Sequence, residues 1–319
     1  MKIVLLERLS VGDDMDVSCF EKLGEFISYD NTVTVEEVKE RISDADAVIA
    51  NKAPMNELSL KDAPKVKFIG ELATGYDNCD IEYCRRRGIR VANVRDYSTA
   101  MVAQHTFTLA LTLSQKIVHY DNYVKSGQYA SQQRFSNFDI PFNELDRKTW
   151  GIVGFGNIGS RVAGIAEAFG CKVLIHSLTG SRHDCRYDQV DKETLLKECD
   201  FISLHCPLSD LSRNFIDKQA LSMMKNSAIL INVARGPVVN NSDLYEALDN
   251  GMIAGAGLDV LEKEPISKDN LLGRIKDSSK LIITPHLAWA SVEARKRCVD
   301  EVFLNLKAFI KGEERNTVC

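Results

Sequence analysis

The stretch WGIVGFGNIG, residues 150–159, decides the fold class of this chain. Its apolar first half predicts a buried strand, and the residues that follow it predict a helix. A sharp turn out of the strand requires Gly154, a pyrophosphate lying against the backbone leaves no room for a Cβ at Gly156, and close packing of helix on strand favours Gly159. The free N–H groups at the start of the helix attract phosphates. Because a strand and a helix flank the glycines, we predict a dinucleotide site rather than a glycine-rich turn that binds nothing.

Strands and helices alternate on both sides of this stretch. Before it, strands are predicted at 2–6, 25–29, 46–50 and 66–72, with helices at 34–42 and 80–87. After it, strands are predicted at 172–176, 201–204, 228–232, 254–259 and 281–283. Such alternation is typical of parallel sheets that are covered by helices on both faces. The predicted fold class is therefore α/β, with two doubly wound parallel-sheet domains.

Length and composition exclude several classes of protein. With 319 residues, the chain is too long for one ordinary core and about right for two domains. A net charge of −5 and the lack of a basic run argue against a nucleic-acid partner. No apolar stretch approaches the roughly 20 residues of a membrane helix, and Met1–Glu7 predicts a short strand rather than a secretory signal. We expect neither a nucleic acid nor a membrane as partner.

Nine cysteines are scattered along the chain without a CxxC pair or a metal-ligand spacing. This pattern predicts no metal site and no redox pair. An odd, scattered set is typical of reduced thiols, so we expect a cytoplasmic protein.

Two segments bear on how the domains are assembled. Residues 99–123 are apolar on more than one face, which predicts a helix that is buried on several sides. It is either a core helix between the domains or one that also packs against a second subunit, and the sequence leaves both open. The last predicted helix, 291–311, leads into no further strand. We expect it to return to the first domain.

Three polar side chains follow predicted strands of the second half. Arg235 follows 228–232, Glu264 comes shortly after 254–259, and His286 comes directly after 281–283. Open parallel sheets bind ligands beyond the carboxyl ends of their strands, so these side chains are predicted to share one edge. If the dinucleotide carries a nicotinamide, hydride transfer needs a proton donor and a cation for the substrate's charge. Each residue alone has an ordinary alternative as a capping or surface group, but their joint placement favours a catalytic set.

Seven strings carry a resemblance to a known family. They are LATGYDN (72–78), YSTAMVAQHTFTLAL (97–111), GIVGFGNIG (151–159), LHCPLS (204–209), INVARGPVVN (231–240), GLDVLEKEP (257–265) and TPHLAWAS (284–291). With these strings the chain resembles the D-isomer-specific 2-hydroxyacid dehydrogenases over nearly its whole length. Within that family it is similar to the glycerate dehydrogenase, or hydroxypyruvate reductase, group.

The resemblance implies roles for individual residues. His286 would be the acid/base, Glu264 would orient it, and Arg235 would hold the carboxylate and carbonyl oxygen of the substrate. Backbone N–H groups at Thr74 and Gly75 would also bind the substrate carboxylate. Lys52 either faces the substrate or is an ordinary surface lysine, and the sequence leaves both open.

The resemblance also implies a domain organisation and a set of cofactor contacts. A Rossmann-type cofactor domain, residues 99–287, would be inserted into a flavodoxin-like substrate domain made of 1–98 and 288–319, with the active site in the cleft between them. The implied cofactor contacts are Val102, Gly154, Gly156, Asn157, Ile158, Gly159, Ser177, Arg182, Cys206, Pro207, Val233, Ala234, Asp259, His286 and Ala288.

One position departs from the NAD-binding pattern. An acidic residue usually ends the second strand, roughly 20 residues past the glycines, and binds the ribose 2′-hydroxyl. Here Ser177 stands at that place, and Thr179, Ser181 and Arg182 follow it. Without a carboxylate to repel a 2′-phosphate, these side chains predict that NADP is accepted as well as NAD.

The sequence therefore predicts a homodimeric oxidoreductase that reduces a small 2-keto acid to the D-2-hydroxy acid with NAD(P)H. Hydroxypyruvate or glyoxylate fits best, because the first-domain turns offer little positive charge besides Lys52. Alternatives are a D-lactate-type or bulkier D-2-hydroxyacid dehydrogenase and, in another class, an NAD(H)-sensing interaction protein similar to corepressors. Formate oxidation on a related scaffold is disfavoured by Glu264.

Overall fold

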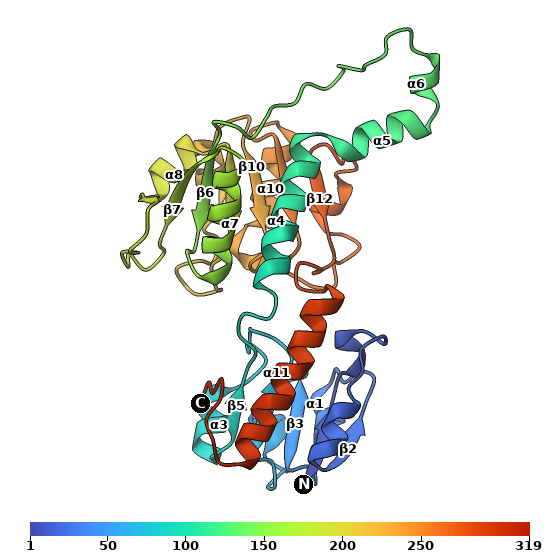
Figure 1. Ribbon diagram of the computed structural model, residues 1–319, viewed down its shortest axis with the longest axis vertical. Helices are drawn as coiled ribbons and strands as arrows, with labels where there is room; N and C mark the ends of the chain where they lie inside the picture. The colour runs from blue at the N-terminus through green and yellow to red at the C-terminus, as the bar shows by residue number, and fades with distance from the viewer. The chain divides into compact units, whose positions relative to one another are not determined.

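The computed structural model describes all residues, 1–319, and divides into two compact units (Figure 1). Unit 1 comprises Met1–Ser98 and Ala290–Cys319, and unit 2 comprises Thr99–Trp289. The sequence placed the second boundary at 287/288. Unit 2 is thus inserted into the chain of unit 1, and each unit has its own parallel sheet.

Unit 1 is built on a five-stranded sheet in which all strands are parallel. The order is β2-β1-β3-β4-β5, with bounds Glu25–Ser28, Lys2–Leu5, Ala47–Ala50, Phe68–Glu71 and Arg90–Ala92. This is the flavodoxin-like order, whose topological switch point lies between β1 and β3. Strands β3 and β4 are buried at every residue, as expected when helices cover both faces. In this sheet, β5 is the one strand that was not predicted from the sequence.

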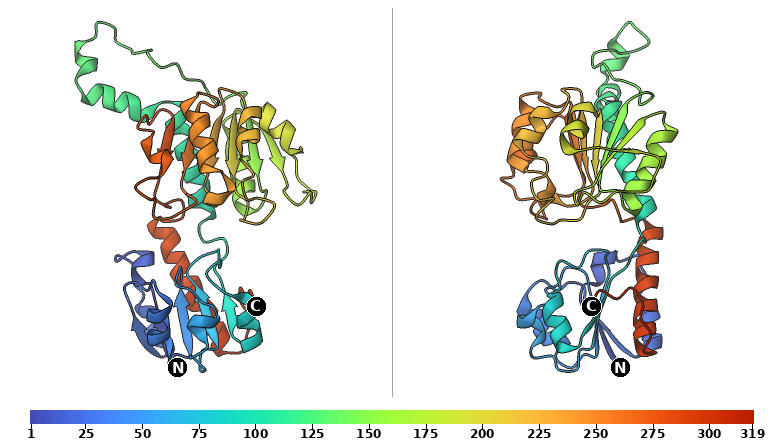
Figure 2. Two further views of the ribbon diagram at one scale, coloured as in Figure 1. Left: turned by 180° about the vertical axis from the view of Figure 1, so that it is seen from behind. Right: turned by 90° about the vertical axis from the view of Figure 1, so that its left-hand side faces the viewer.

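Four α-helices belong to unit 1: α1 (Val35–Ile42), α2 (Glu57–Leu60), α3 (Ile81–Arg87) and α11 (Val292–Ile310). A capping box starts α1, because the Thr34 side chain accepts the backbone N–H of Glu37 while Glu37 bonds back to Thr34. The last helix, α11, lies against the unit 1 sheet (Figure 2), where the rings of Phe68 and Phe309 are 5.0 Å apart. Here α11 covers apolar strand surface that the first 98 residues leave open.

Unit 2 contains seven parallel strands in the order β12-β11-β10-β9-β6-β7-β8. Their bounds are Leu281–Ile283, Gly255–Leu258, Ile229–Asn232, Phe201–Leu204, Thr149–Val153, Lys172–His176 and Asp188–Gln189. Strand order reverses between β6 and β9, which is the switch point at which doubly wound sheets bind dinucleotides. The α-helices packed around the sheet are α4 (Thr99–Ser114), α7 (Asn157–Ala168), α8 (Lys192–Glu198), α9 (Lys218–Met223) and α10 (Asn241–Asp249).

The long helix expected over 99–123 is two helices. Lys116 has a φ of 56°, in the left-handed region, so the chain bends there and α5 (Ile117–Lys125) begins. Helix α4 lies in the core of unit 2, where the approach is so close that a Cβ on Gly257 would be 2.9 Å from Cβ of Leu109. Helix α5, in contrast, has no buried residue. Only the first half of the apolar stretch, α4, is therefore buried in the core of unit 2.

A projecting segment, residues 117–142, extends away from the rest of unit 2 and includes α5 and α6 (Gln128–Ser131) (Figure 1). We call it the arm. Phe135 is 90% exposed, Phe138 69% and Phe142 55%. The arm also forms a groove of about 630 Å³ lined mainly by aromatic side chains. The arm was not predicted from the sequence, because its exposed aromatic residues have no helical or strand periodicity.

None of the helices combines the length and the apolar composition that a bilayer crossing requires.

Candidate active site

The glycine turn after β6 has the geometry of a phosphate-binding loop. Gly154 has a φ of 89°, and a Cβ there would be 2.8 Å from the backbone nitrogen of Cys206. A Cβ on Gly159 would be 2.2 Å from the carbonyl oxygen of Gly154. Helix α7 can therefore pack this closely on the turn only because residue 159 is a glycine. Beside Gly156 there is open space, and no side chain caps the start of α7. The turn thus fits a dinucleotide pyrophosphate, which would lie in the open space beside Gly156 at the start of α7.

Most of the cofactor contacts implied by the resemblance follow strands at the carboxyl edge of the unit 2 sheet. Cys206 and Pro207 follow β9, and Cys206 is buried against the turn at Gly154. Buried side chains that lie near this edge include Val102 on α4, Val233 and Ala234 after β10, and Ala288 after β12. Asn157 is exposed and Ile158 half-buried in the first turn of α7. The apolar side chains among these residues would suit the floor of a nicotinamide site.

Hydroxyl groups follow the end of β7. They begin with Ser177, at the place where NAD-specific sites have an acidic residue. Ser177 Oγ lies 3.3 Å from Thr179 Oγ1, which in turn lies 2.8 Å from Ser181 Oγ. Thr179, Ser181 and Arg182 are exposed. No carboxylate interrupts this row, so its hydroxyl donors are open to an anion.

Three neighbouring strands deliver the predicted catalytic side chains. Arg235, Glu264 and His286 follow β10, β11 and β12, which are adjacent in the sheet. Because the strands are parallel, their carboxyl ends share one edge, the same edge as the glycine turn.

His286 and Glu264 are in direct contact. Nδ1 of His286 lies 2.7 Å from Oε2 of Glu264, and Oε1 of Glu264 accepts the backbone N–H of Leu261. Both oxygens of the carboxylate are therefore held, and it fixes the orientation of the ring. With Nδ1 so engaged, Nε2 is the nitrogen left for proton transfer. His286 also has a φ of 56°, a conformation that is uncommon for a residue with a side chain and is typical of functional sites.

The Arg235 loop is shaped by its neighbours. Asn232 at the end of β10 accepts the N–H of Ala234 and donates to the carbonyl of Arg235. A Cβ on Gly236 would come within 1.9 Å of the carbonyl carbon of Leu261, so the loop packs directly against the chain that leads to Glu264. Arg235 itself is half-buried, and its Nη1 donates to the carbonyl of Ala234. The guanidinium is thus held on the catalytic edge.

Asp259 is a buried carboxylate that organises the His286 loop. Its side chain is 1% exposed and accepts the backbone N–H groups of Leu287 (2.7 Å) and Ala288 (2.8 Å) and the hydroxyl of Thr284 (2.6 Å). Nε2 of His105 on α4 lies 3.4 Å from it. Burial alone would raise the pKa of Asp259, but these hydrogen bonds outweigh burial and hold the pKa below its ordinary value.

The contacts of His105 and Thr284 were not predicted, although both residues lie within the strings of the family resemblance. Nε2 of His105 lies 2.9 Å from Oγ1 of Thr284. The only signal for His105 was a histidine in an otherwise apolar helix, which predicts a buried polar partner without identifying it.

The predicted substrate residues of unit 1 lie beyond the ends of neighbouring strands. Lys52 follows β3 and is exposed, and Thr74 and Gly75 follow β4. Within unit 1, no backbone carbonyl accepts a hydrogen bond from the N–H of Thr74, Gly75 or Tyr76. These donors suit an anionic ligand.

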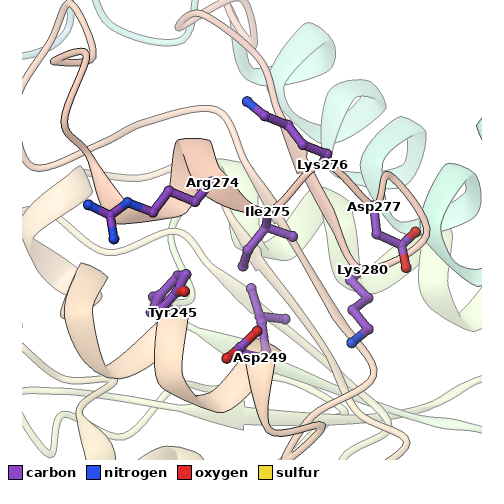
Figure 3. A pocket seen from close by; sticks show the side chains of 8 residues that line it. Tyr245, Asp249, Arg274, Ile275, Lys276, Asp277 and Lys280 are labelled. Carbon is purple, nitrogen blue, oxygen red and sulfur yellow. The ribbon is translucent and has the colours of Figure 1, made fainter.

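A further cavity lies away from the catalytic edge. It has a volume of about 230 Å³ and is lined by Tyr245, Asp249, Arg274 and Lys280, among others (Figure 3). Lys280 precedes β12, whereas His286 follows it, so this cavity belongs to the opposite edge of the sheet. It plays no part in the catalytic set.

Known proteins resemble this chain over its full length. A hydroxypyruvate reductase of Blautia hydrogenotrophica is 40% identical, over 100% of this chain and 99% of the relative. A glycerate dehydrogenase of Methylorubrum extorquens is 39% identical, over 99% and 98%. The structure of an NADPH-dependent glyoxylate/hydroxypyruvate reductase of Sinorhizobium meliloti, in complex with NADP and malonate, is similar with a TM-score of 0.85 and 26% identity, covering 100% of this chain and 96% of that one. Residues 107–288 match the NAD-binding domain of the D-isomer specific 2-hydroxyacid dehydrogenases. The chain belongs to this family of NAD(P)-dependent oxidoreductases.

Proposed function

We propose that this enzyme reduces a small 2-keto acid, hydroxypyruvate or glyoxylate, to the corresponding hydroxy acid, which for hydroxypyruvate is D-glycerate. The observation that carries the proposal is the contact of His286 with Glu264 on the edge that also holds Arg235. The names of the two relatives that are about 40% identical support the same substrates.

In the proposed reaction, a proton and a hydride are added across the keto group. When bound, the reduced nicotinamide supplies the hydride to the keto carbon. Nε2 of His286 donates a proton to the carbonyl oxygen, and the Glu264 carboxylate stabilises the imidazolium before transfer. Arg235 binds the substrate carboxylate and the carbonyl oxygen, which polarises the carbonyl. Water then returns a proton to His286, and in the oxidative direction the same nitrogen accepts the proton.

We infer that unit 1 contributes substrate binding. The N–H groups of Thr74 and Gly75, which bond to no backbone carbonyl of unit 1, support a role in holding the substrate carboxylate. Lys52 follows the switch point of the unit 1 sheet, where ligands bind in this topology, which supports an electrostatic role.

NADP acceptance is the finer proposal for the cofactor. It is supported by the hydroxyl row from Ser177 to Ser181 and by the exposed Arg182, because hydroxyl and guanidinium groups donate to a phosphate. The NADP complex of the Sinorhizobium meliloti enzyme shows that related chains use this cofactor.

We also propose that two copies of the chain associate through the arm. Its exposed phenylalanines and groove give an apolar surface of a kind that monomers seldom leave in water. All nine cysteines are free thiols, which supports a reducing compartment, the cytoplasm.

A screen of purified enzyme against 2-keto acids with both reduced nicotinamides tests the proposal. The panel is glyoxylate, hydroxypyruvate, pyruvate and a branched 2-keto acid, and the readout is the loss of absorbance of NADH or NADPH. We expect the highest kcat/KM for hydroxypyruvate or glyoxylate. A preference for pyruvate or the branched acid would overturn the substrate assignment, and no turnover with any of the four would overturn the activity.

A further inference from the structure

Unit 1 also contains a fully buried carboxyl group. Glu71 is the last residue of β4, and its side chain is fully buried. It accepts hydrogen bonds from Nδ2 of Asn78, at 3.2 and 3.3 Å, and from the thiol of Cys79, at 3.0 Å. These partners lie on the far side of the turn that contains Thr74 and Gly75. Glu71 therefore closes this turn from beneath, joining its beginning to its end.

The same turn is tied to the loop after β3. Nδ2 of Asn78 also donates to the carbonyl of Ala53 at 3.0 Å, and the N–H of Met55 donates to the carbonyl of Asn78 at 2.9 Å. The loop after β3 is itself held by Glu7, whose carboxylate accepts the N–H groups of Asn51, Lys52 and Ala53. The two loops thus form one network, in which Glu71 is the innermost group.

The other side of the turn is anchored independently. Nδ2 of Asn93 donates to the carbonyl of Thr74, and the hydroxyl of Thr74 donates to the carbonyl of Val94. With Asn93 on one side and Glu71 on the other, the position of the N–H groups of Thr74 and Gly75 depends on both anchors. Glu71 contacts the end of the turn through Asn78 and Cys79, so a change at Glu71 would act on these N–H groups only indirectly.

The ionisation of Glu71 changes the charge beneath the Thr74–Gly75 turn, and it depends on burial and on nearby groups. Burial raises the pKa of Glu71 to about 7, against the hydrogen bonds from Cys79 and Asn78. The charged or titratable groups that act on it are Glu7 after β1, Lys52 after β3, and the thiols of Cys79 and Cys84. Burial also raises the pKa of the Cys79 thiol, which therefore stays protonated as a donor. An ionised Glu71 adds a second buried negative charge beneath a turn that binds an anion.

We propose that Glu71 is a positioning residue, whose buried carboxyl holds the Thr74–Gly75 turn and whose protonation strengthens the binding of a substrate carboxylate there. The inference rests on the proposed function, since it assigns the substrate carboxylate to this turn. It adds a group that does not touch the substrate and acts through Asn78 and Cys79.

The first arm of the test measures kcat and KM for the best 2-keto acid from pH 5.5 to 9 in wild type, Glu71→Gln and Glu71→Leu. In wild type we expect KM to rise by about tenfold as Glu71 ionises, since a buried charge acts on the bound anion through a low dielectric. In Glu71→Gln this part of the KM profile should disappear, while the profile of kcat stays that of wild type. Glu71→Leu, which lacks an acceptor for Asn78 and Cys79, should raise KM at every pH. Superimposable KM profiles of wild type and Glu71→Gln would overturn the proposal.

The second arm needs no substrate. It measures urea unfolding midpoints over the same pH range, with Glu40→Gln, an exposed carboxyl of unit 1, as the matched control. A raised native pKa gives stability that is present below the unfolded value, about 4.3, and is lost as the pH rises through about 7. The unfolding midpoint of Glu71→Gln should therefore rise relative to that of wild type between pH 5 and 7.5. The midpoint of Glu40→Gln should not. If wild type reduces no 2-keto acid, the proposed function fails, whereas a flat stability difference for Glu71→Gln refutes the titration of Glu71.

Discussion

Nδ1 of His286 lies 2.7 Å from Oε2 of Glu264, although 22 residues separate them in the chain. The contact exists because β11 and β12 are adjacent parallel strands whose ends deliver both side chains to one edge. In the proposed reaction this contact orients the histidine as acid/base, since the carboxylate holds one ring nitrogen and leaves the other for the substrate.

Replacing His286 by Ala removes the proton donor, so kcat should fall by about 10³-fold, within the range that positioned acid/base groups contribute. Dissociation constants for NADH and NADPH, measured by fluorescence titration, should stay within a few-fold of wild type. Glu264→Gln keeps an acceptor but loses the charge that stabilises the imidazolium, and kcat should fall by about tenfold to a hundredfold. A His286→Ala enzyme with near-normal turnover would exclude this histidine from the reaction.

Arg235→Lys tests whether the guanidinium fork, rather than positive charge alone, binds the substrate. Lysine offers a point charge without bidentate geometry, so kcat/KM for the 2-keto acid should fall by about 10- to 100-fold. Arg147→Lys, on a side chain that is 92% exposed in the same unit, is the matched control and should be neutral. Steady-state kinetics at saturating cofactor provide the measurement, and an unchanged kcat/KM in Arg235→Lys would contradict the assignment.

Ser177→Asp restores the acidic group that ends the second strand in NAD-specific sites. The carboxylate would repel a 2′-phosphate, so kcat/KM with NADPH should fall by about 10²-fold while that with NADH is maintained or rises. Ser222→Asp, at an exposed position on α9, controls for the added charge. A wild-type enzyme with a strong preference for NADH would refute the inference drawn from the serine.

Some features of this molecule could be predicted from the sequence, and others could not. The strands around 150–159 and the capped helix after Thr34 follow from local patterns, because glycine geometry and capping are decided by a few neighbouring residues. The joint placement of Arg235, Glu264 and His286 also followed, since parallel strands expose their carboxyl ends together. The resemblance added the roles of these residues, which no local pattern contains.

Other features could not be predicted because they depend on tertiary contacts. Lys116 breaks an apolar stretch that is uniform in composition, and nothing local marks the left-handed residue. Glu71 and Cys79 meet only because the turn between them folds back on β4. The short strands β5 and β8 exist through pairing with longer neighbours, since three or two residues carry no periodicity of their own.

Asp259→Asn should destabilise unit 2 in a pH-dependent way. The amide can accept only part of the hydrogen bonds that the carboxylate accepts from Thr284, Leu287 and Ala288, so the free energy of unfolding at pH 7 should fall by about 2 to 3 kcal/mol. Because the native pKa of Asp259 is lowered, its stabilisation is present above the unfolded value of about 3.9 and is lost as the pH falls through the native value.

Urea unfolding from pH 7 to pH 3 measures this difference. The gap between wild type and Asp259→Asn should narrow below about pH 4. Asp188→Asn, at an exposed carboxylate of the same unit, should follow the wild-type curve throughout. A gap that stays constant across the range would show that the charge of Asp259 contributes nothing to folding.

The arm provides the test of assembly. Phe135 and Phe138 are 90% and 69% exposed, which is costly in water unless another surface covers them. If a second copy does so, the double variant Phe135→Asp/Phe138→Asp should elute as a monomer, whereas wild type should show twice the mass of 35.6 kDa by size-exclusion chromatography with light scattering. Leu211→Asp, at an exposed leucine of unit 2 outside the arm, should remain dimeric. A monomeric wild type would leave the aromatic surface to a different partner and overturn the homodimer.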